Sequence, residues 1–599
     1  MLNNPVIRDA TVLVFIVCFS MNVIGAPIEA QSAVTEQSLM HSGDSLLDTS
    51  WAGSRVGVIA PMDIPLILAG NFGELRADHF HTGLDFKTQG QEGVPVLAAT
   101  DGAIARVKVS PFGYGRALYL SGPEGITTVY AHLQRFAPAI ESWARSQQYN
   151  NQQFELDEWP HQSFVYEAGD TIGWSGNSGG SGGPHLHFEI RETASQRPLN
   201  PLFWNFHVAD STAPELGGIW LLPQENGAIN GRKRPVKLEH EGKVMVQGGF
   251  RVAIDAFDRL DAAYNRCGIY KAELRWGQTL VFDWELDTLD FSINRDMNAH
   301  AYYPAWNTTG EQAHRMHRLP GNRLPVYSAA ASSGVIGCKA EKGCEESLSV
   351  QVWDVHGNST KKQWQVVVKS SESSEEGVAL GHGKLSQEKT QEIRSEDGIQ
   401  VFCPANAFYE DFEMNLERGP EGIFQLGNAN VPVAKAIEVR VGMLSAVGGA
   451  PMDLCSDKTA VRWIDESGSS QDWYPGVCEG SDFVFSTRHL GRYRFDVDSV
   501  APSISPHSRY EESADSVLSV LRIDELRFNL IDKGVGVSDF EATLDGEWIL
   551  MRWDPKRERI WYELDDQRHV TGRDQRLLIT ATDEVGNRSE WMGWVRFHP

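Results

Sequence analysis

Short apolar runs separated by glycine-containing turns dominate the chain beyond its N-terminal region. The run at 94–99 ends before an Asp-Gly turn at 101–102, and the run at 117–120 ends before Gly122. Short runs bounded in this way are typical of β-strands, whereas a helix needs a longer segment with apolar positions every three to four residues. The pattern predicts a mainly β protein.

One segment departs from the strand pattern. Phe136, Ile140, Trp143 and Ala144 recur at helical spacing, which predicts a helix inserted between two strands. An acidic and aromatic stretch at 154–160 follows this helix and is a candidate wall for a neighbouring cleft.

An internal repeat marks two later parts of the chain. The sequence Asp-Ser-Thr-Ala-Pro at 210–214 recurs as Asp-Ser-Val-Ala-Pro at 498–502, and Asp-Val-His-Gly-Asn at 354–358 recurs as Asp-Glu-Val-Gly-Asn at 583–587. The same markers therefore open and close both segments. We interpret the segments as two related β-sandwiches of immunoglobulin-like type, the first enlarged by an insertion around 285–330.

The first residues have the pattern of an export signal. Arg8 precedes an apolar run at 11–25, and small residues continue to Ala30. The run is too short to span a bilayer comfortably. We expect cleavage near Ala30, no stable membrane insertion afterwards, and an exported location, either periplasmic or at the cell surface and beyond.

A chain of 599 residues is too long for one hydrophobic core, so several domains are expected. The polar mixture of Ser, Glu, Gln and Lys after residue 369 has the composition of a linker. The predicted organisation is a signal peptide at 1–30, a flexible leader at 31–55, a β-rich domain at 56–208, an immunoglobulin-like domain at 209–368, a disordered linker at 369–396, a β-rich domain at 397–497 and an immunoglobulin-like domain at 498–599.

The formal net charge of -26 at pH 7 bears on the choice of partner. An acidic surface repels phosphate, which argues against nucleic acid and against anionic membranes. The C-terminal β-domains are the candidate sites for a protein partner.

Six cysteines remain after Cys18 leaves with the signal, an even number in an oxidising compartment. They are Cys267, Cys338, Cys344, Cys403, Cys455 and Cys478. Disulfides are compatible with this set, and the sequence leaves their pairing open. None of these cysteines has the C-x-x-C spacing of a zinc knuckle, which favours buried thiols or disulfide bonds over metal binding.

A group of histidines and one aspartate carries the candidate chemistry. His185 and His187 are two residues apart, so in a strand both side chains emerge on one face. With His81 and Asp85 upstream, imidazoles and a carboxylate can supply three ligands and leave a fourth tetrahedral position to water, as in catalytic zinc sites. His132 is a further candidate imidazole.

The residues around this group resemble those of the lysostaphin-type, LytM-like zinc metallopeptidases over about a quarter of the chain. The blocks that carry the resemblance, in order, are His-Thr-Gly-Leu-Asp at 81–85, Gly-Val-Pro-Val at 93–96 with Asp-Gly at 101–102, Gly-Tyr-Gly at 113–115, Tyr-Ala-His-Leu at 130–133, the glycine-rich turn from Ser175, and Gly-Pro-His-Leu-His-Phe-Glu at 183–189. The resemblance implies a LytM-like antiparallel β-sheet peptidase domain at 56–208, followed by three β-rich domains.

Carried over residue by residue, the resemblance places the Zn²⁺ ligands at His81, Asp85 and His187. It places the catalytic histidines at His132 and His185, and leaves open which one is the general base. It implies a zinc-dependent endopeptidase that hydrolyses peptide cross-links or stem peptides of bacterial peptidoglycan, by attack of a zinc-bound water assisted by the two histidines. The exact bond is not implied.

Two residues near the group have open roles. Glu189 follows His187 at two residues' distance, where it would either support the ligand imidazole or, as we expect, face solvent. His79 is expected to be a surface or packing histidine, because the family pattern needs no ligand there.

Two alternatives from other functional classes accompany the enzyme. Some relatives with this fold have lost metal ligands, which would make this chain a catalytically silent wall-binding or hydrolase-regulating protein. The filled ligand and catalytic positions favour the enzyme. A third reading makes the β-sandwiches the main function, as an adhesin or assembly scaffold.

Overall fold

The computed structural model describes residues 57–598, apart from 162–163, 205–206, 225, 329–332, 339–342, 370–383, 421, 443–455, 466–469, 509, 511–516, 522–524 and 565–567. The predicted signal peptide at 1–30 and leader at 31–55 lie outside the described residues. No helix in this described part is long and apolar enough to cross a membrane.

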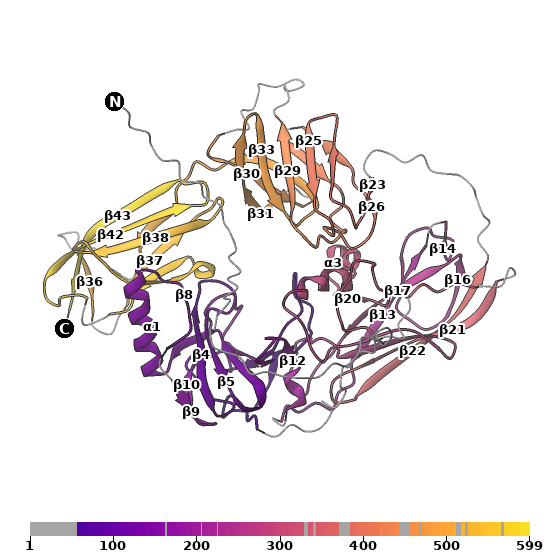
Figure 1. The fold of residues 1–599 in the computed structure, drawn as a ribbon, viewed down its shortest axis with the longest axis horizontal. Coiled ribbons are helices and arrows are strands. Elements are labelled where there is room, and N and C mark those ends of the chain that lie inside the picture. Colours follow the sequence, from indigo (N-terminus) through magenta and orange to yellow (C-terminus); the bar gives the residue numbers. More distant parts are fainter. Residues whose placement is uncertain are drawn as a thin grey trace, which may run out of the picture. The chain divides into compact units, whose positions relative to one another are not determined.

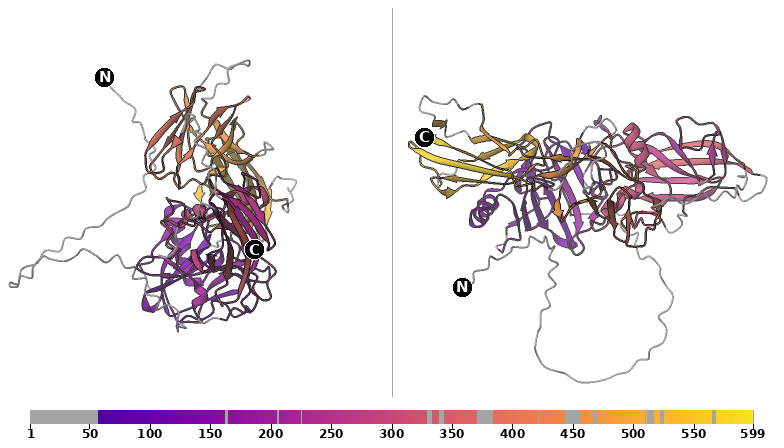
Figure 2. Two further views of the ribbon diagram at one scale, coloured as in Figure 1. Left: turned by 90° about the vertical axis from the view of Figure 1, so that its right-hand side faces the viewer. Right: turned by 90° about the horizontal axis from the view of Figure 1, so that it is seen from above.

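Strands form most of the regular structure, and nearly all of them pair in antiparallel fashion (Figures 1 and 2). This confirms the prediction of a mainly β protein. Each sheet of the described residues draws its strands from one of the intervals 68–199, 215–369, 384–497 and 503–597. The division of the chain into independent domains stays a prediction.

Residues 68–199 form two sheets. The larger sheet has the order β1-β2-β11-β6-β5-β4-β8, with β12 beside β11 and β9 beside β4, and the smaller has the order β3-β10-β7. The bounds are β1 Leu68–Gly70, β2 Leu84–Lys87, β3 Pro95–Leu97, β4 Gly102–Val109, β5 Arg116–Ser121, η2 Pro123–Gly125, β6 Ile126–Ala131, β7 Leu133–Phe136, β8 Leu156–Glu158, β9 Val165–Tyr166, β10 Thr171–Ser175, β11 His185–Glu192, β12 Pro198–Leu199 and η3 Pro201–Phe203.

The predicted helix between two strands is confirmed as α1, Pro138–Asn151. A proline in its first turn suits the helix start, because the missing N–H would be unpaired there in any case. Ile140 and Ala144 lie on its buried face. The stretch at 154–160 supplies β8, which lies at the opposite edge of the sheet from β1 and β2. This stretch extends the sheet and is separated from β11 by three other strands.

Residues 215–369 form a sheet with the order β15-β13-β17-β20 and a second with the order β14-β16-β22-β21-β18-β19. The predicted insertion at 285–330 holds three short helical segments and β20. The bounds are β13 Glu215–Pro223, β14 Ala228–Ile229, β15 Val236–Leu238, β16 Lys243–Gln247, β17 Phe250–Phe257, β18 Lys271–Trp276, β19 Thr279–Glu285, η4 Asn294–Asp296, α2 Met297–His300, α3 Tyr303–Thr309, β20 Ala313–Arg315, β21 Cys344–Trp353 and β22 Ser359–Lys369.

The last interval repeats this topology. The order β36-β43-β42-β38-β39 matches β16-β22-β21-β18-β19 strand by strand, and its first pair is parallel in both. The structure thus confirms the internal repeat, while the immunoglobulin-like class stays a prediction. The bounds are β35 Ser503–Pro506, β36 Val517–Val520, β37 Leu526–Ile531, β38 Val537–Leu544, β39 Glu547–Trp548, β40 Met551–Asp554, η5 Pro555–Arg557, β41 Arg559–Tyr562, β42 Asp574–Asp583 and β43 Arg588–Phe597.

The predicted linker at 369–396 is too long at its C-terminal end. Residues 370–383 lie outside the described part, but β23 and β24 pair in sheets. Alternate residues of β24 are exposed, so this edge strand has the polar composition that also marks linkers. The bounds in this interval are β23 Lys384–Leu385, β24 Gln391–Arg394, β25 Ile399–Cys403, β26 Phe412–Glu413, β27 Leu416–Arg418, β28 Ile423–Leu426, β29 Ile437–Gly442, β30 Thr459–Ile464, β31 Ser470–Pro475, β32 Val477–Glu479, β33 Asp482–Thr487 and β34 Gly491–Val497.

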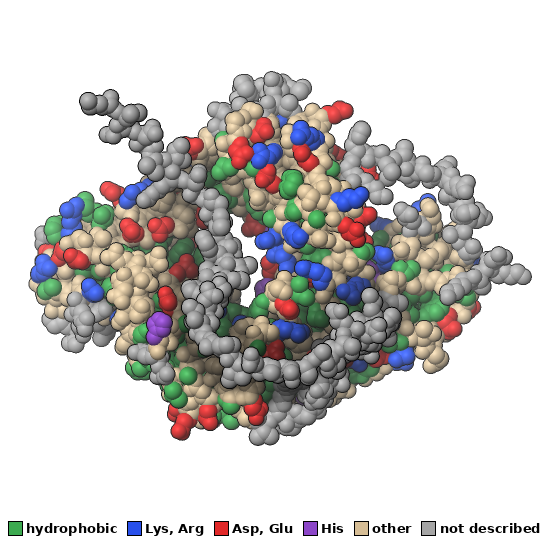
Figure 3. Space-filling view, viewed as in Figure 1, with side chains coloured by type: hydrophobic (Ala, Val, Ile, Leu, Met, Phe, Trp, Pro, Cys, Tyr) green, Lys and Arg blue, Asp and Glu red, His purple; other side chains and the backbone are tan. Residues whose placement is uncertain are grey.

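Cysteine pairing and surface charge add two further observations. Among the described residues, the thiols of Cys267, Cys338, Cys344 and Cys403 are not joined in disulfides, and Cys455 lies outside the described part. Acidic and basic side chains are both spread over the face shown in Figure 3. The net charge of -26 is therefore not gathered into one acidic patch on this face.

The insertion at 285–330 contacts the segment that precedes β2. The buried Asn294 side chain accepts a hydrogen bond from the Phe80 backbone N–H at 3.1 Å and donates one to the Phe80 carbonyl at 3.0 Å. Phe80 is fully buried, and the two intervals share one hydrophobic core. The Asn294 side-chain amide thus pairs with both the N–H and the carbonyl of Phe80, the residue before His81.

We expect Asn294→Ala to lower the free energy of unfolding by about 1–3 kcal/mol, because it leaves two buried backbone groups of Phe80 unpaired. The measurement is denaturant unfolding followed by tryptophan fluorescence. Asn150→Ala, at an exposed helical position, is the matched control and should unfold like the wild type. Equal midpoints for the two variants would contradict the role given to Asn294.

Candidate metal centre

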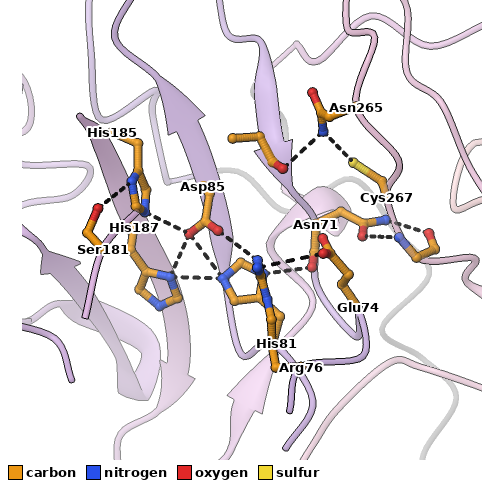
Figure 4. A network of polar contacts seen from close by, with 12 residues as sticks. Asn71, Glu74, Arg76, His81, Asp85, Ser181, His185, His187, Asn265 and Cys267 are labelled. Atoms are coloured by element: carbon orange, nitrogen blue, oxygen red, sulfur yellow. Dashed lines mark hydrogen bonds and ion pairs between the residues drawn. The ribbon is translucent and has the colours of Figure 1, made fainter. Parts of the chain in front are cut away.

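Two neighbouring antiparallel strands bring the predicted residues together. In the pairing of β2 with β11, His187 lies directly opposite Asp85 and His185 lies opposite Lys87. Figure 4 shows His185 and His187 on one strand and Asp85 on its neighbour. The expected shared face of His185 and His187 is therefore confirmed.

Gly83 is required by the close approach of β2 and β11. A Cβ atom at this position would lie 2.4 Å from the Phe188 carbonyl oxygen and 3.0 Å from Cε1 of His187. Since any side chain would push the strands apart, glycine is the residue that fits between His81 and Asp85. This gives a physical reason for the glycine in His-Thr-Gly-Leu-Asp.

Three donor atoms converge in a buried group. Nε2 of His81 lies 3.0 Å from Oδ1 of Asp85 and 3.0 Å from Nδ1 of His187, and the His187 nitrogen lies 2.9 Å from the same oxygen. The three residues are 4% to 8% exposed. Their donor atoms lie within 4.8 Å of one another and could hold a metal ion.

The other polar atoms of this trio are fixed by neighbours. Nδ1 of His81 lies 2.7 Å from the Asn71 carbonyl oxygen, and Nε2 of His187 lies 2.8 Å from Oε1 of Glu189. Arg76 donates to Oδ2 of Asp85 at 2.9 Å. A carbonyl or carboxylate accepts a hydrogen bond from each outer imidazole nitrogen, so in the neutral rings the inner nitrogens carry the lone pairs that a metal would bind.

Glu189 is fully buried, so the expectation that it faces solvent is wrong. Its carboxylate accepts hydrogen bonds from Thr82 at 2.6 Å, Tyr114 at 2.5 Å and Arg191 at 2.6 Å, besides contacting His187. Burial raises the pKa of Glu189, but Arg191 and His187 outweigh burial and hold this pKa well below its usual range. Arg191 lies two residues after Glu189 and therefore on the same face of the strand, which is the sequence feature that could have predicted a buried Glu–Arg pair.

The charges of this network act on His187. Burial lowers its pKa, but hydrogen bonds with Asp85 and Glu189 outweigh burial and raise the pKa of His187 to about 9. A divalent cation competes with the second proton for Nδ1, so metal binding at this group releases a proton.

His132 and His185 lie beside the trio with their rings 4.7 Å apart. Nδ1 of His132 lies 2.8 Å from the Ser178 carbonyl oxygen, and Nδ1 of His185 lies 2.8 Å from that of Gly183. Both imidazoles must donate from Nδ1, which leaves Nε2 as the proton acceptor in the neutral form. Burial, followed by the neighbouring histidines, lowers the pKa of His132 to about 3.

The turn that carries these carbonyls is held by backbone packing. A Cβ atom at Gly179, which has φ of +68°, would lie 2.3 Å from the Gly115 backbone nitrogen. The turn after Ser175 therefore lies directly against the Gly-Tyr-Gly turn at 113–115. His132 has φ of 59°, a conformation that non-glycine residues adopt at functional sites at some cost in strain.

All five site residues expected from the sequence therefore lie in one group. His79 lies outside it with a side chain 52% exposed, which confirms its expected place on the surface. Asn71, Thr82, Tyr114 and the buried role of Glu189 were missed.

Residues 79–148 match peptidase family M23. The DD-carboxypeptidase/endopeptidase Mpg of Neisseria meningitidis is 30% identical over 162 residues, which cover 27% of this chain and 31% of that protein. An uncharacterized metalloprotease of Haemophilus influenzae is 32% identical over 122 residues, which cover 20% of each chain. The chain thus matches less than a third of the length of these relatives.

Among solved structures, the catalytic domain of lysostaphin from Staphylococcus simulans is 24% identical, with 23% of this chain and 90% of that chain covered and a TM-score of 0.18. A zinc-containing peptidase from Vibrio cholerae is 24% identical, with 24% and 39% covered and a TM-score of 0.19. Two imidazoles and one carboxylate are a donor set that suits zinc. Residues 79–148 thus match peptidase family M23, a family of zinc metallopeptidases, and the His-Asp-His group of this region could hold a metal ion.

Proposed function

We propose that this protein is a zinc-dependent endopeptidase that hydrolyses peptide cross-links or stem peptides of bacterial peptidoglycan. The observation that carries the proposal is the buried trio of His81, Asp85 and His187, with two further imidazoles beside it and outside the ligand set. A structural zinc site usually closes its shell with four protein ligands, whereas three ligands leave room for water and substrate.

Three residues would hold the metal. Nε2 of His81, Oδ1 of Asp85 and Nδ1 of His187 are the inner donor atoms. Zinc bound there supplies polarisation of the scissile carbonyl and lowers the pKa of a water molecule to about 7.

The proton transfers fall to His132 and His185. Each has Nδ1 directed at a backbone carbonyl, so Nε2 is the atom that accepts a proton from the attacking water. The same nitrogen can return that proton to the leaving amine or donate a hydrogen bond to the developing oxyanion. The low pKa of His132, about 3, keeps its imidazole neutral before the reaction at neutral pH.

The substrate class is the finer part of the proposal. A relative named DD-carboxypeptidase/endopeptidase is 30% identical over 27% of this chain, which supports peptidoglycan peptides as substrates. Peptidoglycan lies outside the inner membrane, so the proposed location is the periplasm or the cell surface. A protein partner for the C-terminal β-domains remains part of this proposal.

The ligand and catalytic roles predict different losses. We expect His187→Ala to lose zinc and turnover together, whereas His132→Ala and His185→Ala keep zinc and lose about 10²–10⁴-fold in turnover. The measurements are zinc content by mass spectrometry and release of new amines from purified peptidoglycan, with products identified by mass.

His79→Ala, an exposed neighbour of the site, is the control and should retain both properties. A wild-type protein that binds zinc and wall but releases no amine would refute the enzyme and favour a regulator of other hydrolases.

We expect Glu189→Gln to weaken zinc binding by about 10–100-fold, because the amide no longer supplies the negative charge that orients His187 and raises its basicity. Competition with a fluorescent zinc chelator measures the change. Glu192→Gln, an exposed residue on the same strand, is the matched control. Equal zinc affinity in the two variants would remove Glu189 from the metal centre.

A further inference from the structure

Each unit of the internal repeat gathers three aspartates from equivalent positions. The first precedes the opening strand by five residues, the second follows the next long strand, and the third lies at the C-terminal end of the penultimate strand, as the last residue of β42 or the residue after β21. They are Asp210, Asp258 and Asp354 in the first unit, and Asp498, Asp532 and Asp583 in the second. The carboxylates of the second set lie within 4.8 Å of one another, and those of Asp210 and Asp354 lie equally close with His356.

An asparagine at the equivalent position of each unit hydrogen-bonds to two of its aspartates. Asn358 donates to the Asp210 carbonyl at 3.4 Å and to Oδ2 of Asp354 at 2.7 Å. Asn587 donates to the Asp498 carbonyl at 2.8 Å and to Oδ2 of Asp583 at 2.7 Å. The asparagine that ends the repeated motif therefore holds the carboxylate of the third aspartate close to the backbone carbonyl of the first.

Carboxylate oxygens within these groups are buried without a hydrogen-bond partner in the described part of the chain. Oδ1 of Asp258, a residue only 2% exposed, and Oδ2 of Asp532, a residue of intermediate exposure, are two of them. Oδ2 of Asp210, whose side chain is 1% exposed, makes no hydrogen bond with any described residue but lies 3.4 Å from Nδ1 of His356. Asp210, Asp258, Asp354 and His356 line one small cavity in the first unit. Buried carboxylates need a counter-charge, since desolvation penalises them strongly.

The protein itself supplies little of this charge. His356 lies 3.4 Å from Asp210, but its equivalent in the second unit is Val585. Among the described residues, the ion pair at these carboxylates is that of His356 with Asp210; in the second unit Nζ of Lys458 donates to the Val585 carbonyl at 2.7 Å. Burial, together with Asp210 and Asp354, raises the pKa of Asp258 to about 7, as expected where like charges face one another.

We propose that each unit of the repeat binds a Ca²⁺ ion through its three aspartates. Calcium takes six to eight oxygen ligands from carboxylates, backbone carbonyls and water, and the second group offers oxygen donors alone. The clusters are separate from the zinc site, which has imidazole donors. The ion would tie the start of the first strand to the ends of two others, so calcium would stabilise each sandwich.

The test uses the full chain with its zinc site saturated. Ca²⁺ is titrated calorimetrically, and thermal unfolding is compared in CaCl₂ and in NaCl of matched ionic strength. We expect two ions per chain with dissociation constants on the order of 10⁻⁴–10⁻³ M, and a rise in Tm with CaCl₂ alone. An absence of binding and of the Tm rise would overturn the proposal.

Variants separate the two sites from general effects of charge. Asp258→Asn and Asp532→Asn should each remove one bound ion and part of the calcium-dependent Tm rise. Without calcium both variants should unfold at or above the wild-type temperature, because each removes a repelling charge; this readout distinguishes a lost site from a misfolded chain. Asp539→Asn, at an exposed position of the last unit, should bind two ions. Retention of both ions in Asp258→Asn and Asp532→Asn, or loss in Asp539→Asn, would refute the assignment.

Discussion

The register between β2 and β11 is the constraint on which the metal centre depends. It places His187 opposite Asp85, and because side chains alternate along a strand, a slip by one residue would turn both away from the site. Gly83 permits this register by leaving room for the Phe188 carbonyl. His81 lies just before β2. The pairing of β2 with β11 and their close contact at Gly83 therefore bring all three donor atoms together.

The four histidines of the site share one hydrogen-bonding arrangement. Each of the four, at 81, 132, 185 and 187, directs one ring nitrogen at a backbone carbonyl or a buried carboxylate. In the neutral imidazole the opposite nitrogen is thereby the lone-pair donor. The four rings differ in position: the inner nitrogens of His81 and His187 lie 3.0 Å and 2.9 Å from Oδ1 of Asp85, whereas Nε2 of His185 lies 3.4 Å from the same oxygen.

The predictable parts of the site were those set by local spacing or by ordered motifs. His185 and His187 follow from the two-residue period of a strand, and α1 follows from helical spacing. The burial of Glu189 did not follow, because it depends on Tyr114 from another strand connection and on Arg191. The Asn294 bridge joins residues 214 positions apart, a distance over which sequence patterns carry no pairing information. The polar composition of 384–396 predicts a linker where the structure has β24, because an exposed edge strand and a linker share that composition.

The repeat markers show how one pattern can serve two purposes. Asp-Ser-x-Ala-Pro and Asp-x-x-Gly-Asn delimit the two sandwiches in the sequence, and in the fold their aspartates meet at one end of each unit. Turn chemistry explains why Asp and Asn occur there, since Asp354 and Asp583 cap the turns that follow them. Asp532 likewise caps a turn, because its Oδ1 accepts hydrogen bonds from the backbone N–H groups of Gly534 at 2.8 Å and Gly536 at 3.0 Å. Turn chemistry does not explain Asp258, which comes from a different strand and brings a third carboxylate to Asp210 and Asp354. A fold gains nothing in stability from adding a buried negative charge to two others, so Asp258, only 2% exposed, is the aspartate that points to a cation.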